Sequence, residues 1–189
     1  MVSVTFDAPG VSVVAPISYV SPTLINVQIP WEMQGQTSAT VKVRYHDLAG
    51  PPVILPLAAA SPAFFEYTDA TNSALSVVAQ DLNYALITSQ NAAGRGKVIT
   101  LYANGLGPVD NTPATGQQSS ATLLGRTTTQ PQVTIGGKTA QILFSGLTPQ
   151  TIGLYQINVQ VPADAATGLQ PLTLSIGGVT AKSSQIVVQ

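Results

Sequence analysis

No cysteine occurs among the 189 residues, and charged side chains are scarce. Without cysteine the chain has no disulfide, no thiolate zinc site and no cysteine nucleophile. Charged residues make up 8% of the sequence, against roughly 25% in an average soluble domain. The net charge is −1 and the seven basic residues are scattered singly, so we expect no nucleic-acid partner.

Long apolar runs and helical periodicity are nearly absent as well. No run approaches the roughly 20 apolar residues that span a bilayer, so we expect no membrane insertion. The start at Met1–Val4 lacks the features of a signal peptide. Because a strand-like segment begins directly at Val2, we expect the chain to be an excised piece or a mature fragment of a larger protein.

The sequence does have ample apolar residues and many turn formers. Hydrophobic residues make up 44%, which is enough for a core, and Gly and Pro number 16 and 14. Apolar and polar residues alternate over short segments, which is the period of a half-buried β-strand. The predicted strands cover residues 2–6, 11–20, 24–29, 39–46, 52–58, 63–67, 75–80, 84–88, 97–103, 132–136, 139–144, 154–161, 170–176 and 179–188.

Turns and loops are predicted from glycine-rich and polar segments. The Gly-Gly pairs at 136–137 and 177–178 favour two-residue hairpin turns, because glycine adopts the positive φ that a type I′ turn requires. Residues 104–130 are polar and rich in turn formers, which predicts a long loop.

A hexapeptide repeat organises the chain. Ile25–Pro30 returns as Ile157–Pro162 with only its fifth residue changed. A proline-marked turn precedes each copy, and a glycine followed by an alternating segment comes after each. The repeat predicts two related β-modules in series, and the shift in composition near Ala58–Pro62 places the boundary between residues 1–58 and 59–189. Regular strand spacing without crossover helices predicts an all-β protein made of two tandem immunoglobulin-like antiparallel β-sandwich domains.

Four ordered motifs carry a family resemblance over nearly the whole chain: residues 19–32, 60–65, 96–107 and 153–162. They resemble a family of bacterial C-terminal modules of unknown function, best known from large secreted proteins of soil Acidobacteria. Two departures are the absence of the family's leading strands before residue 2 and Ala63 where glycine is common. The resemblance implies an extracellular or cell-surface Ig-like module and no particular reaction. Without leading strands, we expect an exposed sheet edge near residues 2–6 that can accept a neighbouring strand.

Trp31 is the only tryptophan and directly follows Pro30. Three roles stay open for it: contact with a ligand or partner, packing between the two modules, or a place in the core of one module. An exposed indole with Tyr19 or Tyr45 nearby can stack on a sugar ring, whereas a buried one can fill the interface between the two modules. The second hexapeptide copy is followed by Ala163, so the module fold itself does not require the ring. The repeated amides Asn26/Asn158 and Gln28/Gln160 alternate with apolar residues, and their repetition favours a structural role.

Catalytic and metal-binding patterns are weak. His46 is the only histidine and no Gly-x-Ser-x-Gly motif occurs, so we interpret His46 as a solvent-facing strand-end residue. The eight carboxylates fall mostly in turns, where Asp caps backbone amides, and no clustered oxygen ligands for calcium occur beyond Asp110-Asn111.

An intramolecular Lys–Asn isopeptide bond would need a buried lysine. Lys97 with Asn104 and Asp81, and Lys42 with Asn26 and Glu32, supply the residue types. Strand parity, however, turns both lysines outward.

The expected function is therefore a non-enzymatic extracellular spacer or adhesion module, with no catalytic residue, no metal and no cofactor. Expected partners are other domains of a parent protein, surface proteins or polysaccharide. The alternative is a carbohydrate-binding module that uses an aromatic platform at Trp31.

Overall fold

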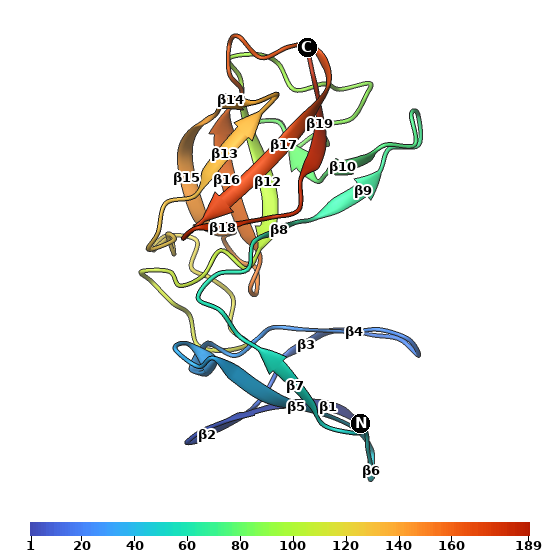
Figure 1. The fold of residues 1–189 in the computed structure, drawn as a ribbon, viewed down its shortest axis with the longest axis vertical. Helices are drawn as coiled ribbons and strands as arrows, with labels where there is room; N and C mark the ends of the chain where they lie inside the picture. The colour runs from blue at the N-terminus through green and yellow to red at the C-terminus, as the bar shows by residue number, and fades with distance from the viewer.

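The computed structural model describes residues 1–189 and confirms the all-β prediction (Figure 1). Every strand pairing is antiparallel, and the only helical segment is a single 3-10 turn, η1 (Trp31–Met33). No helix is long and apolar enough to cross a bilayer. For the description we call residues 1–58 the N-terminal unit and residues 59–189 the C-terminal unit, following the predicted boundary.

The N-terminal unit consists of one sheet and one hairpin, which form the lower part of Figure 1. In the sheet, β1 lies between β2 and β5, and both β6 and β7 pair with β5. The hairpin is formed by β3 and β4. The strand bounds are β1 (Val2–Ala8), β2 (Val11–Val14), β3 (Ile17–Val20), β4 (Ile25–Val27), β5 (Ser38–Tyr45), β6 (Leu48–Ala49) and β7 (Val53–Pro56).

The C-terminal unit is a sandwich of two sheets with an additional hairpin, β9 and β10. One sheet has the order β11-β12-β16-β15, with β8 also on β12, and the other has the order β14-β13-β17, with β18 and β19 both on β17. The strand bounds are β8 (Ala63–Phe64), β9 (Glu66–Thr68), β10 (Leu75–Val77), β11 (Ala79–Gln80), β12 (Val98–Asn104), β13 (Gln132–Ile135), β14 (Lys138–Thr139), β15 (Gln141–Leu147), β16 (Tyr155–Gln160), β17 (Gly168–Ile176), β18 (Val179–Thr180) and β19 (Ser184–Val188).

Two hydrophobic clusters lie on either side of residues 58–59. The C-terminal cluster contains 24 buried residues, to which every second residue of β12, of β16 and of β17 from Leu172 onward contributes, as period-2 alternation requires. The N-terminal cluster contains only five: Val4, Phe6, Ala15, Met33 and Ala39. The N-terminal unit therefore has a much smaller core, and the division into two domains remains a prediction.

The same strand order occurs in both units. The sheet order β2-β1-β5, with β6 and β7 on β5, matches β14-β13-β17, with β18 and β19 on β17. The β3–β4 hairpin corresponds to β15–β16, and β4 and β16 contain the two hexapeptide copies. The predicted Gly-Gly turns are confirmed, since all four glycines have positive φ and each turn joins paired strands.

Several longer predicted strands are interrupted. The strand predicted over 11–20 divides into β2 and β3 at Ala15–Pro16, because proline has no N–H to donate to a strand ladder. The strand predicted over 84–88 is wrong. Asp81 accepts the N–H groups of Asn83 and Ala85 and curls this segment, which leaves only an isolated bridge at Leu86.

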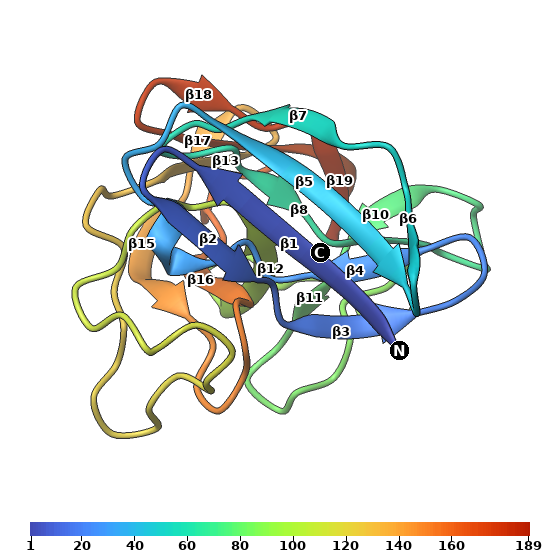
Figure 2. The same cartoon turned by 90° about the horizontal axis from the view of Figure 1, so that it is seen from below.

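The predicted exposed edge near residues 2–6 is wrong from Val4 onward, and only Val2 and Ser3 have no strand on their second side. Over this range β1 pairs with β5, and from Thr5 onward it pairs with β2 on its other side (Figure 2). The chain folds back through the Pro9–Gly10 turn to supply that second partner. An open edge exists elsewhere in this unit, as described below.

The connection between the units packs against a glycine pair. Ser61 N donates to the carbonyl of Gly105, and Tyr155 Oη donates to the carbonyl of Gly107. A Cβ on Gly105 would lie 1.9 Å from Ser61 O, and one on Gly107 would lie 2.6 Å from Ala59 O. Both glycines have positive φ, so this close approach requires residues without a side chain.

We expect Gly105→Ala to lower the free energy of unfolding by about 2–4 kcal/mol, since it combines a backbone clash with left-handed strain. Gly177→Ala is the matched control. Gly177 has φ 57° and no atom within 4 Å of its Cβ position, so only the strain of about 1–2 kcal/mol remains. Urea denaturation measures both variants. Equal losses would show that the close approach at Ser61 contributes nothing.

Candidate functional site

The strongest candidate site is the contact between the units, centred on the turn Trp31–Met33. Buried Pro30 precedes the turn. Met33 is 3% exposed within the N-terminal cluster, whereas partly buried Trp31 packs against the C-terminal cluster. Two side chains of a single helical turn therefore reach the cores of both units.

Three hydrogen bonds join the turn and the nearby Gln28 to the long loop of the C-terminal unit. Trp31 N donates to Thr115 Oγ1 at 3.0 Å, and the Thr115 hydroxyl donates to Glu32 Oε2 at 2.6 Å. Gly116 N donates to Gln28 Oε1 at 2.9 Å. The backbone at Gly116 and Gly153 packs closely against the N-terminal unit. A Cβ on Gly116 would lie 3.0 Å from Pro16, and a Cβ on Gly153 would lie 3.3 Å from Gln28. The contact combines apolar packing with bonds of fixed direction.

The indole nitrogen takes no part in this network. Trp31 Nε1 is buried and has no hydrogen-bond partner. The ring therefore acts here as an apolar body, and the polar bonds come from its backbone and its neighbours. Of the three roles left open for Trp31, packing between units agrees with this position.

The two tyrosines of the predicted platform lie on separate strands. Tyr19 is on β3 with 51% of its surface exposed, and Tyr45 ends β5 with 59% exposed. The end of β5 lies next to β6, at the end of the N-terminal unit far from the C-terminal unit (Figure 1). Tyr45 meets the ring of His46 edge-on at 4.6 Å. The structure thus places Tyr45 and Trp31 at opposite ends of the unit.

His46 lies in the two-residue turn between β5 and β6. Its φ is 52°, it is exposed, and its Nε2 lies 3.1 Å from the amino terminus. No group of three or more His, Cys, Asp or Glu side chains is placed to hold a metal ion.

Three of the eight carboxylates, Asp69, Asp81 and Asp110, accept backbone amides as predicted, and the other five do not. Asp69 is 3% exposed and accepts the N–H groups of Thr71 and Ser89, both at 2.8 Å. Both bonds lower the pKa of Asp69 below its ordinary 3.8, and the bond from Ser89 has the larger effect. Hydrogen bonds from Ala85 and then Asn83 lower the pKa of Asp81 in the same way. Both aspartates organise the loops that flank β10 and β11.

The lysines point outward, as strand parity predicted. Lys97 is exposed, and Lys42, with 54% of its side chain exposed, pairs with Asp7 at 3.0 Å. Neither is a buried lysine of the kind an isopeptide bond needs.

The repeated amides bind backbone groups. Gln160 Nε2 donates to the carbonyl of Gly96 at 2.9 Å, and Gln28 accepts from Gly116, so the predicted structural role is confirmed for both glutamines. Asn158 Oδ1 accepts from Thr100 and Gln156, whereas Asn26 is exposed on β4. Sequence reasoning missed Thr115 and Gly116, because nothing near them in the loop distinguishes them.

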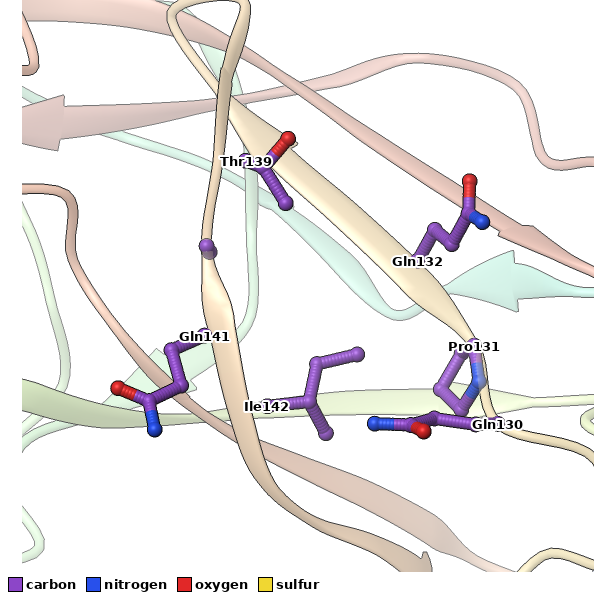
Figure 3. Close-up of a pocket in the computed structure, with 7 residues that line it drawn as sticks. Gln130, Pro131, Gln132, Thr139, Gln141 and Ile142 are labelled. Carbon is purple, nitrogen blue, oxygen red and sulfur yellow. The ribbon is translucent and has the colours of Figure 1, made fainter.

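A hollow of about 520 Å³ opens between β13 and β15 (Figure 3). It is lined by Gln130, Pro131, Gln132, Thr139, Ala140, Gln141 and Ile142. The amide groups of Gln132 and Gln141 point in different directions, and only Ile142 turns toward Gln130 and Pro131. Binding pockets hold polar groups that converge on a ligand, and this hollow has none.

No protein-family model, curated protein or solved structure matches the chain. The resemblance to the acidobacterial modules therefore remains a prediction that rests on the four motifs.

We expect Trp31→Phe to keep nearly all of the stability, because the indole N–H makes no bond that phenylalanine would lose. Trp31→Ala should lose about 2 kcal/mol from the apolar surface it exposes. Thermal unfolding of the two variants beside the unaltered protein measures the difference. A large loss in Trp31→Phe would contradict the prediction.

The lowered pKa of Asp69 predicts acid-dependent stability. The folded state binds a proton on Asp69 less readily than the unfolded state, so its stabilisation is complete above pH 3.8 and disappears as the pH falls through the lowered pKa. Asp69→Asn should be less stable than the unaltered protein at pH 7, and the difference should shrink below pH 3.8. Urea denaturation across this range measures it, with Asp47→Asn as a control at an exposed turn position. A pH-independent difference would contradict the prediction.

Proposed function

We propose that this chain is a non-enzymatic Ig-like spacer or adhesion module of a larger secreted or cell-surface protein, with domains at residues 1–58 and 59–189. The contact at Trp31 is the observation that carries the proposal. A spacer must hold its parts in a fixed orientation, and here a ring packed on the far core and three directed hydrogen bonds restrain the junction.

The connecting segment supports the same function. Interfaces between domains that move freely are small and polar. Here the segment leaving β7 is held by Ser61 N on Gly105, at a position where only glycine fits. The turn at Trp31 and the segment at Ser61 are two separate attachments, and two attachments resist bending better than one.

The surface of the chain suits contacts with uncharged partners. Charged residues are scarce, and one face of the N-terminal sheet exposes the large apolar side chains of Tyr45, Leu48 and Val53. Exposed apolar side chains that lie together mark protein interaction sites in soluble proteins. An adhesion role with neighbouring domains or surface proteins is consistent with this composition.

The carbohydrate-binding alternative has less support from the geometry. Stacking on a sugar requires an exposed ring face, and the indole of Trp31 packs against the C-terminal cluster. Tyr19 and Tyr45 are exposed but belong to different elements.

Residual dipolar couplings test the rigid spacer directly. We expect couplings from both units of the unaltered chain to fit one alignment tensor. Trp31→Ala combined with Thr115→Val should need two tensors, because this double variant removes the packed ring and two of the three hydrogen bonds. Trp31→Phe is the matched control and should keep one. Two tensors for the unaltered chain would refute a rigid spacer.

A polysaccharide-binding screen separates the two functions. The spacer proposal expects no saturable binding by the unaltered chain. Saturable binding that disappears in Trp31→Ala, while the fold survives, would favour the carbohydrate-binding module instead.

A further inference from the structure

The N-terminal unit lacks one strand that the C-terminal unit has. In the C-terminal unit, β16 lies between β15 and β12 and pairs with β12 from Val98↔Gln160 to Ala103↔Tyr155. In the N-terminal unit, β4 carries the other hexapeptide copy and pairs with β3 alone. No strand of the unit corresponds to β12, so one edge of β4 is open.

The backbone groups of this edge face away from β3. Gln28 N donates to Pro16 O and Ser21 N donates to Leu24 O, which directs positions 24, 26 and 28 toward β3. In an antiparallel pair the intervening residues direct their N–H and C=O groups to the other side. Those residues are Ile25 and Val27, and no hydrogen bond outside the strand ladders uses their backbone groups.

Apolar side chains beside this edge are exposed. In the C-terminal unit β14 is followed directly by β15, so the chain passes from one sheet to the other at one side of the sandwich. Counted from that side, β17 is the third strand of one sheet and β12 is the third strand of the other, so β12 faces β17. In the N-terminal unit the same strand order would place an added strand beside β4, where it would face β5 and β7. There Val43, Tyr45 and Val53, which share a face by their pairing register, are 37%, 59% and 59% exposed, whereas Leu172, Leu174 and Ile176 of β17 are at most 2% exposed.

The two hexapeptide copies show the same difference in burial. Ile157 and Val159 are fully buried at 0% exposure, whereas Ile25 and Val27 are only partly buried. The sequences are identical at these positions, so the missing neighbour accounts for the difference rather than the residues themselves.

Charge identifies the kind of partner. Proteins protect open strand edges with charged residues, and no charged residue occurs between Asp7 and Glu32. The edge is therefore complementary to an uncharged strand. The strand β12 shows which residues such a strand would have, because its buried residues Ile99, Leu101 and Ala103 alternate with partly buried ones.

We infer that the open edge of β4 binds an extended, uncharged peptide segment of β12 type, which adds antiparallel to β4 and covers the exposed apolar face of β5 and β7. Main-chain hydrogen bonds from Ile25 and Val27 supply the register, and alternate apolar side chains of the added strand fill the space over Val43 and Val53. This inference does not depend on the proposed spacer function.

The test uses the full chain and a fluorescent peptide with the uncharged sequence of β12, residues 98–104. Fluorescence anisotropy should show saturable binding, and hydrogen exchange at the amides of Ile25 and Val27 should slow on addition of the peptide. The same peptide with Thr100→Pro is the control and should not bind, because proline interrupts the ladder. Absence of binding by the first peptide, or equal binding by both, would overturn the inference.

Two variants of the chain locate the binding edge. Val27→Pro removes an N–H that faces the open side and should abolish binding, whereas Val27→Ala loses a comparable amount of packing but keeps the N–H and should still bind. Equal binding by both variants would place the peptide elsewhere and overturn the inference.

Two further measurements complete the test. Dimerisation of the unaltered chain that Val27→Pro abolishes would show that a second copy occupies the edge, and would also overturn the inference. If Val27→Pro does not fold, a chain with residues 94–131 duplicated ahead of Val2 replaces it. That chain should unfold at a higher temperature and show slowed exchange at Val27, and unchanged values of both would contradict the inference.

Discussion

The arrangement of the whole molecule depends on one helical turn, Trp31–Met33. Its two apolar side chains lie two residues apart, which directs Met33 into the N-terminal cluster and Trp31 against the C-terminal one. Pro30 before the turn is buried, and Thr115 accepts the N–H of Trp31, an N–H that no helical partner would satisfy. Because the same turn contacts the cores of both units, rotation of one unit against the other would expose apolar surface, and this constraint supports the proposed spacer function.

The two units use one strand order but reach different degrees of completion. In the C-terminal unit two sheets cover each other and bury 24 residues, whereas in the N-terminal unit a sheet and a hairpin bury five. A small core leaves little hydrophobic stabilisation. The N-terminal unit therefore depends more strongly on its neighbour and on any strand that joins it. Its exposed apolar face and its open edge both follow from the lack of a strand that corresponds to β12.

Much of the fold was predictable because strands and hairpin turns follow from local sequence patterns, namely the alternation of apolar and polar residues and the Gly-Gly pairs. The alternation in residues 97–103 and 154–161 predicted β12 and β16, and the Gly-Gly pairs predicted two hairpin turns that the positive φ values confirm. The prediction for residues 84–88 failed because hydrogen bonds to Asp81 outweigh the strand propensity of that segment. The exposed edge was placed on β1 because sequence cannot show which strands become neighbours; the Pro9–Gly10 turn supplies β1 with a second partner.

The sequence by itself determined the class of structure and the faces of the strands, since both follow from the period of apolar residues and from the turn formers between them. It named Trp31 as a residue of interest but left three roles open. Only the tertiary structure decided between exposure and packing, because the environment of Trp31 is made by Thr115 and Gly116, more than 80 residues away in the chain. The same holds for the hexapeptide. Identical residues at 25–28 and 157–160 form an open edge in one place and a central strand in the other, since burial depends on the neighbours that the fold supplies.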